Sequence, residues 1–308
     1  MIKTILSSEL PVDEQLLIQK QSITSGTGNK RFCVVTGTHG DELEGQYVCY
    51  LLSRLLQENK DKLNGTVEIY PALNPLGIDS TTRGVPNFDL DMNRIFPGDP
   101  HGSMAESTVH GILQDLVGAD LVIDIHASNI FLREVPQARI STSTVDKLLP
   151  IAEQLHLEFI WIHEAVTVLE STLAYALNER DTPVVVVEMG VGLRITQEYG
   201  ERLVQGILNV MTDMGMWTGP ISLPPCESIL STTGEVEFFN ASESGIFIPY
   251  VDHSMEVSAG QILGEIVDPL AGTVLESIYA KEDGLVFTIR AYPVVYEGSL
   301  IARMFTKR

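Results

Sequence analysis

The sequence predicts an α/β domain followed by a smaller all-β domain, and three observations support this division. From about residue 30 to residue 215, apolar runs typical of buried strands alternate with stretches of helical periodicity. Pro220, Pro224 and Pro225 then interrupt the alternation, and the chain beyond them is β-like and punctuated by glycine. A length of 308 residues is enough for two such units. We therefore predict an α/β domain over residues 1–222 and a β domain over residues 223–308.

In the first half of the α/β region, apolar runs predict strands at 32–35 and 66–71. Between them, valine and leucine recur at helical spacing over 45–58, which predicts an amphipathic helix. Ser103 and Glu106 have the spacing of a capping box, so a further helix is expected to begin there.

The second half continues the same alternation. Strands are predicted at 121–126, 159–163 and 184–187, and helices at 144–157 and 196–213. The residues between 126 and 144 are interpreted as loop that, with the second domain, forms the walls of a substrate pocket; Arg133, Arg139 and the more distant Arg194 are candidates for determining specificity.

A histidine and a carboxylate follow the first of these strands, as His39 and Glu42. Because only two residues separate them, both side chains can turn onto one metal ion. Imidazole nitrogen and carboxylate oxygen are ligands that zinc accepts at about 2.0–2.2 Å. A third ligand is available in His126, at the carboxyl end of the strand predicted at 121–126. Ligands of open α/β sheets gather at those ends. Three protein ligands and an open position for water describe one catalytic zinc ion per chain.

Two further groups complete a candidate active site. Glu188 ends a run of four valines, where a carboxylate is costly unless it is paired or used. Arg83 and Arg94 lie in a polar, turn-rich segment, and the planar guanidinium suits both carboxylates and a developing oxyanion.

With these motifs in view, the chain resembles the succinylglutamate desuccinylase/aspartoacylase family, relatives of the zinc carboxypeptidases. The matching motifs occur in the family's order over roughly residues 30–215: His39, Glu42, Arg83, the segment Asp91–Gly98, His126 and Glu188–Gly190. The resemblance implies a zinc-carboxypeptidase-like mixed sheet flanked by helices.

The mechanism that we expect is zinc-assisted hydrolysis of an amide. Zinc lowers the pKa of a bound water to about 7. Glu188 is the expected general base and then acid, and Arg83 the expected oxyanion donor. The resemblance implies that Asn93 and Arg94 hold a substrate carboxylate or an equivalent polar group. Asp91 and its neighbour Asp89 are expected to orient the arginines, and Asp124 to contact an imidazole N–H.

Each of these residues also has a structural interpretation. His126 can be a hydrogen-bonded core residue, and Glu42 can simply favour a helix N-terminus. Arg83 and Arg94 can form surface ion pairs, and Glu188 can be a structural carboxylate.

At the level of function, the favoured hypothesis is a zinc-dependent deacylase that acts on a small N-acyl amino acid or related N-acylated amine. The alternatives are a zinc carboxypeptidase acting on peptides and a catalytically silent binding or scaffold protein.

Composition limits the partners and the location. A formal net charge of −21 argues against binding to nucleic acid or to an anionic membrane, so an anionic small-molecule substrate would have to be attracted by local arginines. Three cysteines without paired spacing, no signal-like N-terminus and no membrane-spanning apolar run predict a cytoplasmic protein. Assembly into a homo-oligomer is compatible with this composition.

The β domain resembles the small β-sandwich of the lipoyl/biotinyl type. Segments 257–263 and 294–300 look like two copies of one half-motif with a glycine at the turn. Lys281 lacks the sequence context of a modified lysine, so we expect a structural or gating module rather than a carrier.

Overall fold

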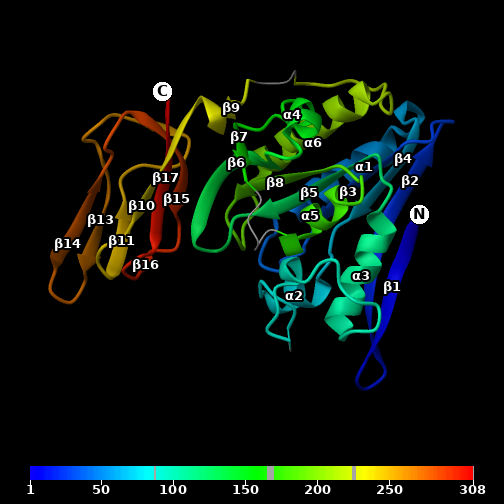
Figure 1. Ribbon diagram of the computed structural model, residues 1–308, viewed down its shortest axis with the longest axis horizontal. Coiled ribbons are helices and arrows are strands. Elements are labelled where there is room, and N and C mark those ends of the chain that lie inside the picture. Colours follow the sequence, from blue (N-terminus) through cyan, green and yellow to red (C-terminus); the bar gives the residue numbers. More distant parts are fainter. Residues whose placement is uncertain (87, 165–169, 224–226, 308) are drawn as a thin grey trace.

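The computed structural model describes the whole chain except residues 87, 165–169, 224–226 and 308. Its main feature is a 13-stranded mixed sheet, whose main path has the order β1-β2-β4-β3-β5-β8-β6-β15-β17-β10 (Figure 1). The strands of this path are β1 (Ile2–Leu10), β2 (Glu14–Ser25), β3 (Arg31–Thr36), β4 (Gly65–Tyr70), β5 (Leu121–Ala127), β6 (Leu132–Ser141), β8 (Val184–Gly190), β10 (Gly234–Asn240), β15 (Gly284–Arg290) and β17 (Leu300–Lys307). The short strands β7 (Phe159–His163), β9 (Ile229–Leu230) and β12 (Met255–Val257) pair beside this path.

The centre of the sheet is parallel. Strand β3 pairs in parallel with β4 on one side and with β5 on the other, and β5 pairs in parallel with β8. Antiparallel β2 and β6 flank this group. The strands predicted from the apolar runs in this region are confirmed.

Helices cover both faces of the parallel strands. The helices are α1 (Glu44–Glu58), α2 (Pro75–Ser80), α3 (Met104–Leu116), α4 (Val145–Ala152), α5 (Leu173–Asn178) and α6 (Gln197–Asp213). Phe32 and Val34 of β3 pack in the core with α1 and α6, whereas Cys33 and Val35 pack in the core with α3 and α5. Burial on both faces explains why β3 is an uninterrupted apolar run rather than an alternating one.

The capping box that predicted α3 is present. Ser103 Oγ accepts a hydrogen bond from the Glu106 backbone N–H, and the Glu106 carboxylate accepts one from the Ser103 N–H. The predicted helices 45–58 and 196–213 correspond to α1 and α6, and the first part of the predicted helix 144–157 corresponds to α4.

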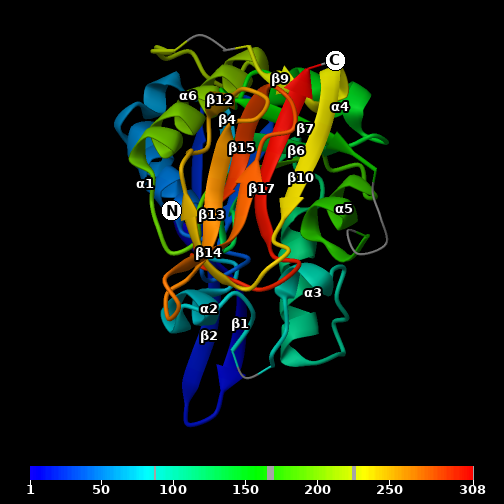
Figure 2. The ribbon, with the colours of Figure 1, turned by 90° about the vertical axis from the view of Figure 1, so that its left-hand side faces the viewer.

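The chain beyond residue 228 is all-β, as predicted. Strands β10, β15 and β17 lie side by side in the large sheet (Figure 2). A second sheet has the order β14-β13-β11-β16 and consists of β11 (Gly245–Pro249), β13 (Ile262–Asp268), β14 (Thr273–Tyr279) and β16 (Val294–Val295). β15 also pairs with β6, so the large sheet continues without a break from the α/β region into these strands. The domain boundary at residue 222 stays a prediction.

Three features were not predicted. Residues 132–141, expected to be loop, form β6, because their burial comes from pairing with β8, β7 and β15 and is not visible in local sequence. The N-terminal hairpin β1–β2 and the short helices α2 and α5 are also absent from the sequence-based assignment.

Cys33 and Cys49 are buried free thiols, and burial raises the pKa of each to about 12. Cys226, Pro224 and Pro225 lie outside the described residues. Within the described part of the chain, none of the helices combines the length and the apolar character needed to span a membrane.

A buried charge network ties the N-terminal hairpin to the sheet. Lys20 Nζ lies 2.9 Å from Glu68 Oε2 and 2.7 Å from Asp115 Oδ2. Tyr70 Oη donates a hydrogen bond of 2.6 Å to Asp115.

Lys20→Ala is expected to lower the free energy of unfolding by about 3 kcal/mol, because loss of one partner of a buried ion pair leaves the other uncompensated. Arg31 lies 3.6 Å from Glu68 and would still partly compensate its charge, so the loss of stability should be near the lower end of the range for a broken buried pair. Urea unfolding of the variant and the wild type measures the change in free energy. The exposed pair of Lys62 and Asp61 is the control, since Lys62→Ala should change stability by roughly 0–1 kcal/mol. Equal unfolding midpoints for the two variants would show that the network does not stabilise the fold.

Candidate metal centre and active site

The predicted site residues meet at the carboxyl ends of the parallel strands. His39 and Glu42 lie in the segment between β3 and α1, and His126 lies in β5. Glu188 of β8 is directly opposite His126 in the strand register. These four residues, together with Arg83, Asn93 and Arg94, line one cavity of about 440 Å³.

The segment carrying His39 packs tightly against α2. A Cβ atom on Gly40 would lie 2.0 Å from the carbonyl carbon of Gly77, so only glycine permits this approach. The Gly40 N–H donates to the carbonyl oxygen of Arg83 at 3.2 Å. The packing and the hydrogen bond of Gly40 therefore position both the neighbouring His39 and the segment that carries Arg83.

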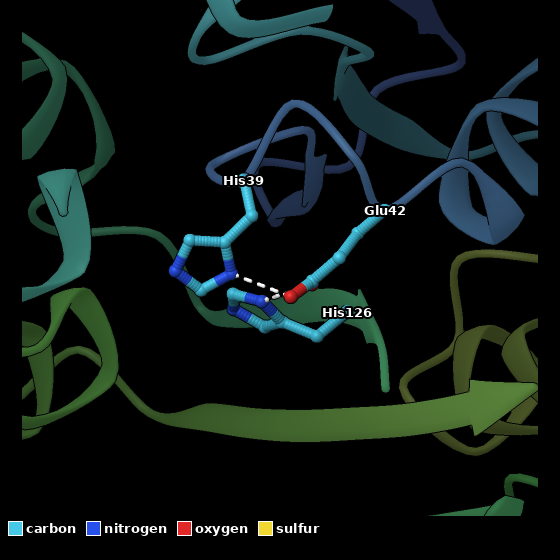
Figure 3. A group of neighbouring side chains, drawn as sticks. All are labelled: His39, Glu42 and His126. Atoms are coloured by element: carbon cyan, nitrogen blue, oxygen red, sulfur yellow. Dashed lines mark hydrogen bonds and ion pairs between the residues drawn. The ribbon is translucent and has the colours of Figure 1, made fainter. Parts of the chain in front are cut away.

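Three buried side chains form a compact group (Figure 3). Potential ligand atoms of His39, Glu42 and His126 all lie within 4.8 Å of one another. Nδ1 of His39 is 2.7 Å from Glu42 Oε1, and Nδ1 of His126 is 2.9 Å from Glu42 Oε2.

The outer nitrogens of the two imidazoles face other carboxylates. Nε2 of His39 lies 3.0 Å from Asp91 Oδ1, and Nε2 of His126 lies 3.3 Å from Asp124 Oδ2. An outer carboxylate that accepts a hydrogen bond from Nε2–H favours the tautomer with a free Nδ1 lone pair, and this arrangement is common behind metal-bound histidines. Both imidazoles thus present Nδ1 to the same point as the Glu42 carboxylate.

The donor set fits a divalent cation. Despite its short contact with Glu42, Nδ1 of His39 is buried without an aligned hydrogen-bond partner among the described residues. A buried nitrogen that is left in this way is costly unless another ligand satisfies it. Two imidazoles and one carboxylate match the His₂Glu set of catalytic zinc sites.

The pKa values of the three residues indicate that this group favours positive charge. Burial opposes ionisation of Glu42, but His39 and His126 outweigh it and hold its pKa well below the usual range. Burial likewise disfavours protonated His126, yet Asp124 and Glu42 raise its pKa well above the usual value. The pKa of His39 is raised by Glu42 and Asp91 against the effect of burial. The three side chains thus form a group that favours added positive charge, which a bound cation would supply.

Arg83 contacts this group directly. Its Nη1 is 2.8 Å from Glu42 Oε1, and its Nε is 3.3 Å from Asp91 Oδ2. Asp91 therefore orients Arg83, as predicted, and also contacts His39. No contact of Asp89 with either arginine is found among the described residues.

The side chains of the two predicted substrate-binding residues, Asn93 and Arg94, form hydrogen bonds with backbone groups. Asn93 Oδ1 accepts a hydrogen bond of 2.9 Å from the Leu173 N–H, which fixes the start of α5 beside the cavity. Arg94 Nη1 donates to the carbonyl oxygen of Asn93 at 2.8 Å. No acidic side chain among the described residues forms an ion pair with Arg94, so its charge remains available to an anionic group in the cavity.

Glu188 is a half-buried carboxylate beside the three clustered residues. Burial raises its pKa to about 7, although Arg139 and His126 act in the opposite direction. Arg139 Nη1 lies 3.2 Å from Glu188 Oε1. A carboxylate that titrates near neutral pH has the pKa expected of a general base.

Of the three candidate specificity arginines, only Arg139 lines the cavity. Arg133 pairs with Asp252 at 3.4 Å, and Arg194 donates to the Leu193 carbonyl oxygen; neither lines the cavity. Sequence reasoning missed Glu134 and Arg303, which also line it, since Arg303 lies 169 residues beyond Glu134 and no local pattern connects them.

The fold and site define an α/β protein whose polar residues converge at the carboxyl ends of parallel strands. Residues 29–214 match the model of the succinylglutamate desuccinylase/aspartoacylase catalytic domain, so the chain belongs to that family. The resemblance of the motifs is thereby confirmed.

Individual relatives extend the comparison over most of the chain. It is 27% identical over 278 residues to the N-alpha-acetyl-L-2,4-diaminobutyric acid deacetylase of Halomonas elongata, covering 86% of this chain and 79% of the relative. A crystal structure of a succinylglutamate desuccinylase/aspartoacylase from Rhodobacter sphaeroides matches with a TM-score of 0.81 at 24% identity, over 96% of this chain and 90% of that one. The product-bound ectoine utilization protein EutE (DoeB) from Ruegeria pomeroyi matches with a TM-score of 0.78 at 22% identity, over 95% and 89%. These structures have the same fold.

His126→Ala should yield folded protein with sharply reduced metal content, since it removes one of the three converging ligands. Metal analysis of protein dialysed against zinc measures the effect, and His101→Ala, an exposed histidine, is the control. Full zinc occupancy in His126→Ala would show that the metal binds elsewhere.

Proposed function

We propose that the protein is a zinc-dependent amidohydrolase that removes the acyl group from a small N-acyl amino acid or related N-acylated amine. The observation that carries the proposal is the convergence of His39 Nδ1, His126 Nδ1 and the Glu42 carboxylate beside Glu188 in one cavity. His39, Glu42 and His126 would hold one zinc ion per chain. Zinc, when bound, supplies a Lewis acid that polarises a carbonyl and acidifies water.

The catalytic residues have separate tasks in this proposal. Glu188 takes a proton from the attacking water and passes it to the leaving amine. Arg83, which is partly exposed to the cavity, donates to the oxygen that becomes negative in the tetrahedral state. It contacts Glu42 in this structure, and a cation among the three ligands would compete with that contact and free the guanidinium.

The substrate class follows from the site together with the relatives. Arg94 and Asn93 line the cavity on the side of α5, and the guanidinium of Arg94, which forms no ion pair within the described residues, suits a substrate carboxylate. A cavity of about 440 Å³ accommodates a small molecule rather than a folded polypeptide. The Halomonas relative is named a deacetylase of an N-acetylated amino acid, which agrees with this class.

The remaining assignments belong to the same proposal. The catalytic domain comprises residues 1–222 with a zinc-carboxypeptidase-like sheet, and residues 223–308 form the β domain. The free, buried thiols of Cys33 and Cys49 agree with a reducing cytoplasm.

Glu188→Gln preserves size and hydrogen-bonding shape but removes the basic oxygen. The variant should keep its zinc and lose about 10²–10⁴-fold in turnover of the best N-acyl substrate, the range typical of general acid–base catalysis. In the wild type, turnover should fall as pH drops and Glu188 becomes protonated, because Glu188 must be deprotonated to act. Release of the free acid from a panel of N-acyl amino acids measures both. Near wild-type turnover in Glu188→Gln would make Glu188 structural.

The two arginines should differ in their kinetic effects. Arg83→Ala should mainly lower kcat, since the oxyanion exists only in the transition state, whereas Arg94→Ala should mainly raise KM. Steady-state kinetics on one substrate with both variants separates these effects. Small and equal changes would show that neither arginine contacts the substrate.

A further inference from the structure

A continuous series of charged side chains connects Glu188 with the C-terminal β strands. Arg139 Nη1 lies 3.2 Å from Glu188 Oε1, and Arg139 Nη2 lies 2.9 Å from Glu134 Oε2. The other oxygen of Glu134 is 2.6 Å from Arg303 Nη1. The four side chains alternate in sign, and all of them line the cavity.

The series depends on an irregularity in β6. Glu134 and Arg139 are five residues apart, and an odd separation places side chains on opposite faces of a regular strand. The register between β6 and β8 shifts between Glu134 and Gln137, which marks a bulge. A bulge changes the alternation of faces, and both side chains consequently reach the cavity.

Glu134 is the most deeply buried member of this series, and it holds both arginines. Its side chain is only 1% exposed, and it accepts hydrogen bonds from Arg139 and Arg303. Trp161 lies beside both guanidinium groups, with ring-centre distances of 5.7 Å to Arg139 and 5.3 Å to Arg303. A planar guanidinium between a carboxylate and an aromatic ring has little freedom to turn. The Glu134 carboxylate and the Trp161 ring thus limit the orientations open to Arg139.

Besides its ion pair with Glu134, Arg139 forms a second one with Glu188. In the described part of the chain, this is the one ion pair that Glu188 forms. A general base has to be held within a narrow range of orientations to act on a proton in the transition state.

We propose that Arg139 is a positioning residue for Glu188, and that Glu134 and Arg303 hold Arg139 in place, so that β17 of the C-terminal strands acts on the catalytic base. This inference rests on the proposed role of Glu188. It assigns the C-terminal region a part in catalysis, since Arg303 is the one member of the series that comes from it.

The test compares Arg139→Met and Arg303→Met in the full-length, zinc-loaded protein. Arg139→Met should lower kcat by about tenfold or more, a part of the roughly 10²–10⁴-fold that loss of the base itself costs. Arg303→Met should lower kcat by a smaller factor, because Glu134 still holds Arg139. In both variants KM should change by less than about threefold and zinc content should stay at the wild-type level, as positioning of the base affects only the transition state. Arg139→Lys should fall between wild type and Arg139→Met, because one ammonium group cannot hold both carboxylates as the guanidinium fork does.

Arg133→Met is the matched control. Arg133 also projects from β6 and pairs with a C-terminal residue, Asp252, at 3.4 Å, but it does not line the cavity. Its loss should leave kcat unchanged. If Arg139→Met does not fold, Glu134→Gln replaces it, since this variant weakens the hold on Arg139 with almost no change in shape.

Unchanged kcat in Arg139→Met would overturn the proposal, and a raised KM in the same variant would make the arginines a binding site for a substrate anion. Crystals of metal-free Arg139→Met provide a readout that does not depend on activity. A Glu188 carboxylate displaced from its wild-type position supports the proposal, and an unmoved one contradicts it. Absence of hydrolysis by the wild type would instead refute the proposed function, and the crystal comparison would still test the role of Arg139.

Discussion

The carboxylate of Glu42 is the group on which the arrangement of this site depends. It is almost completely buried, and it contacts His39 at 2.7 Å, Arg83 at 2.8 Å and His126 at 2.9 Å. The backbone N–H of Ala127 donates to it as well, at 3.1 Å. A carboxylate cannot remain ionised in such a place without several positive or donor partners. The ends of β3 and β5 and the loop that bears Arg83 therefore meet around it, which fixes the relative positions of the proposed ligands.

The layers around Glu42 show how the fold supports the chemistry. Asp91 and Asp124 lie behind the imidazoles, and both Nδ1 atoms face Glu42. The parallel strands β3, β5 and β8 end together, so Glu188 comes to lie beside His126 without any long connection. Residues of β6 and Arg303 of β17 line the cavity on the side of Glu188 that faces away from His126. The active site that we propose is consequently shared between the α/β region and the C-terminal strands.

Sequence reasoning was most accurate where local pattern and tertiary structure agree. The valine run before Glu188 and the apolar run before His126 predicted buried strands, and their carboxyl-terminal residues lie in the cavity. The capping box at Ser103 correctly predicted the start of α3. Strand β6 was missed because its polar and charged residues are stabilised by partners such as Arg303, which are distant in sequence. The irregular register of β6 also breaks the alternation by which a strand is recognised. The hairpin β1–β2 was missed for a related reason: its burial comes from α3 and β4 rather than from its own composition.

In the proposed site, two imidazoles and one carboxylate hold zinc with an open position for substrate or water. X-ray absorption at the zinc edge of the purified protein tests it most directly. We expect nitrogen and oxygen ligands at about 2.0–2.2 Å, with outer-shell scattering from two imidazole rings. A sulfur shell at about 2.3 Å, or scattering from no more than one imidazole, would contradict it.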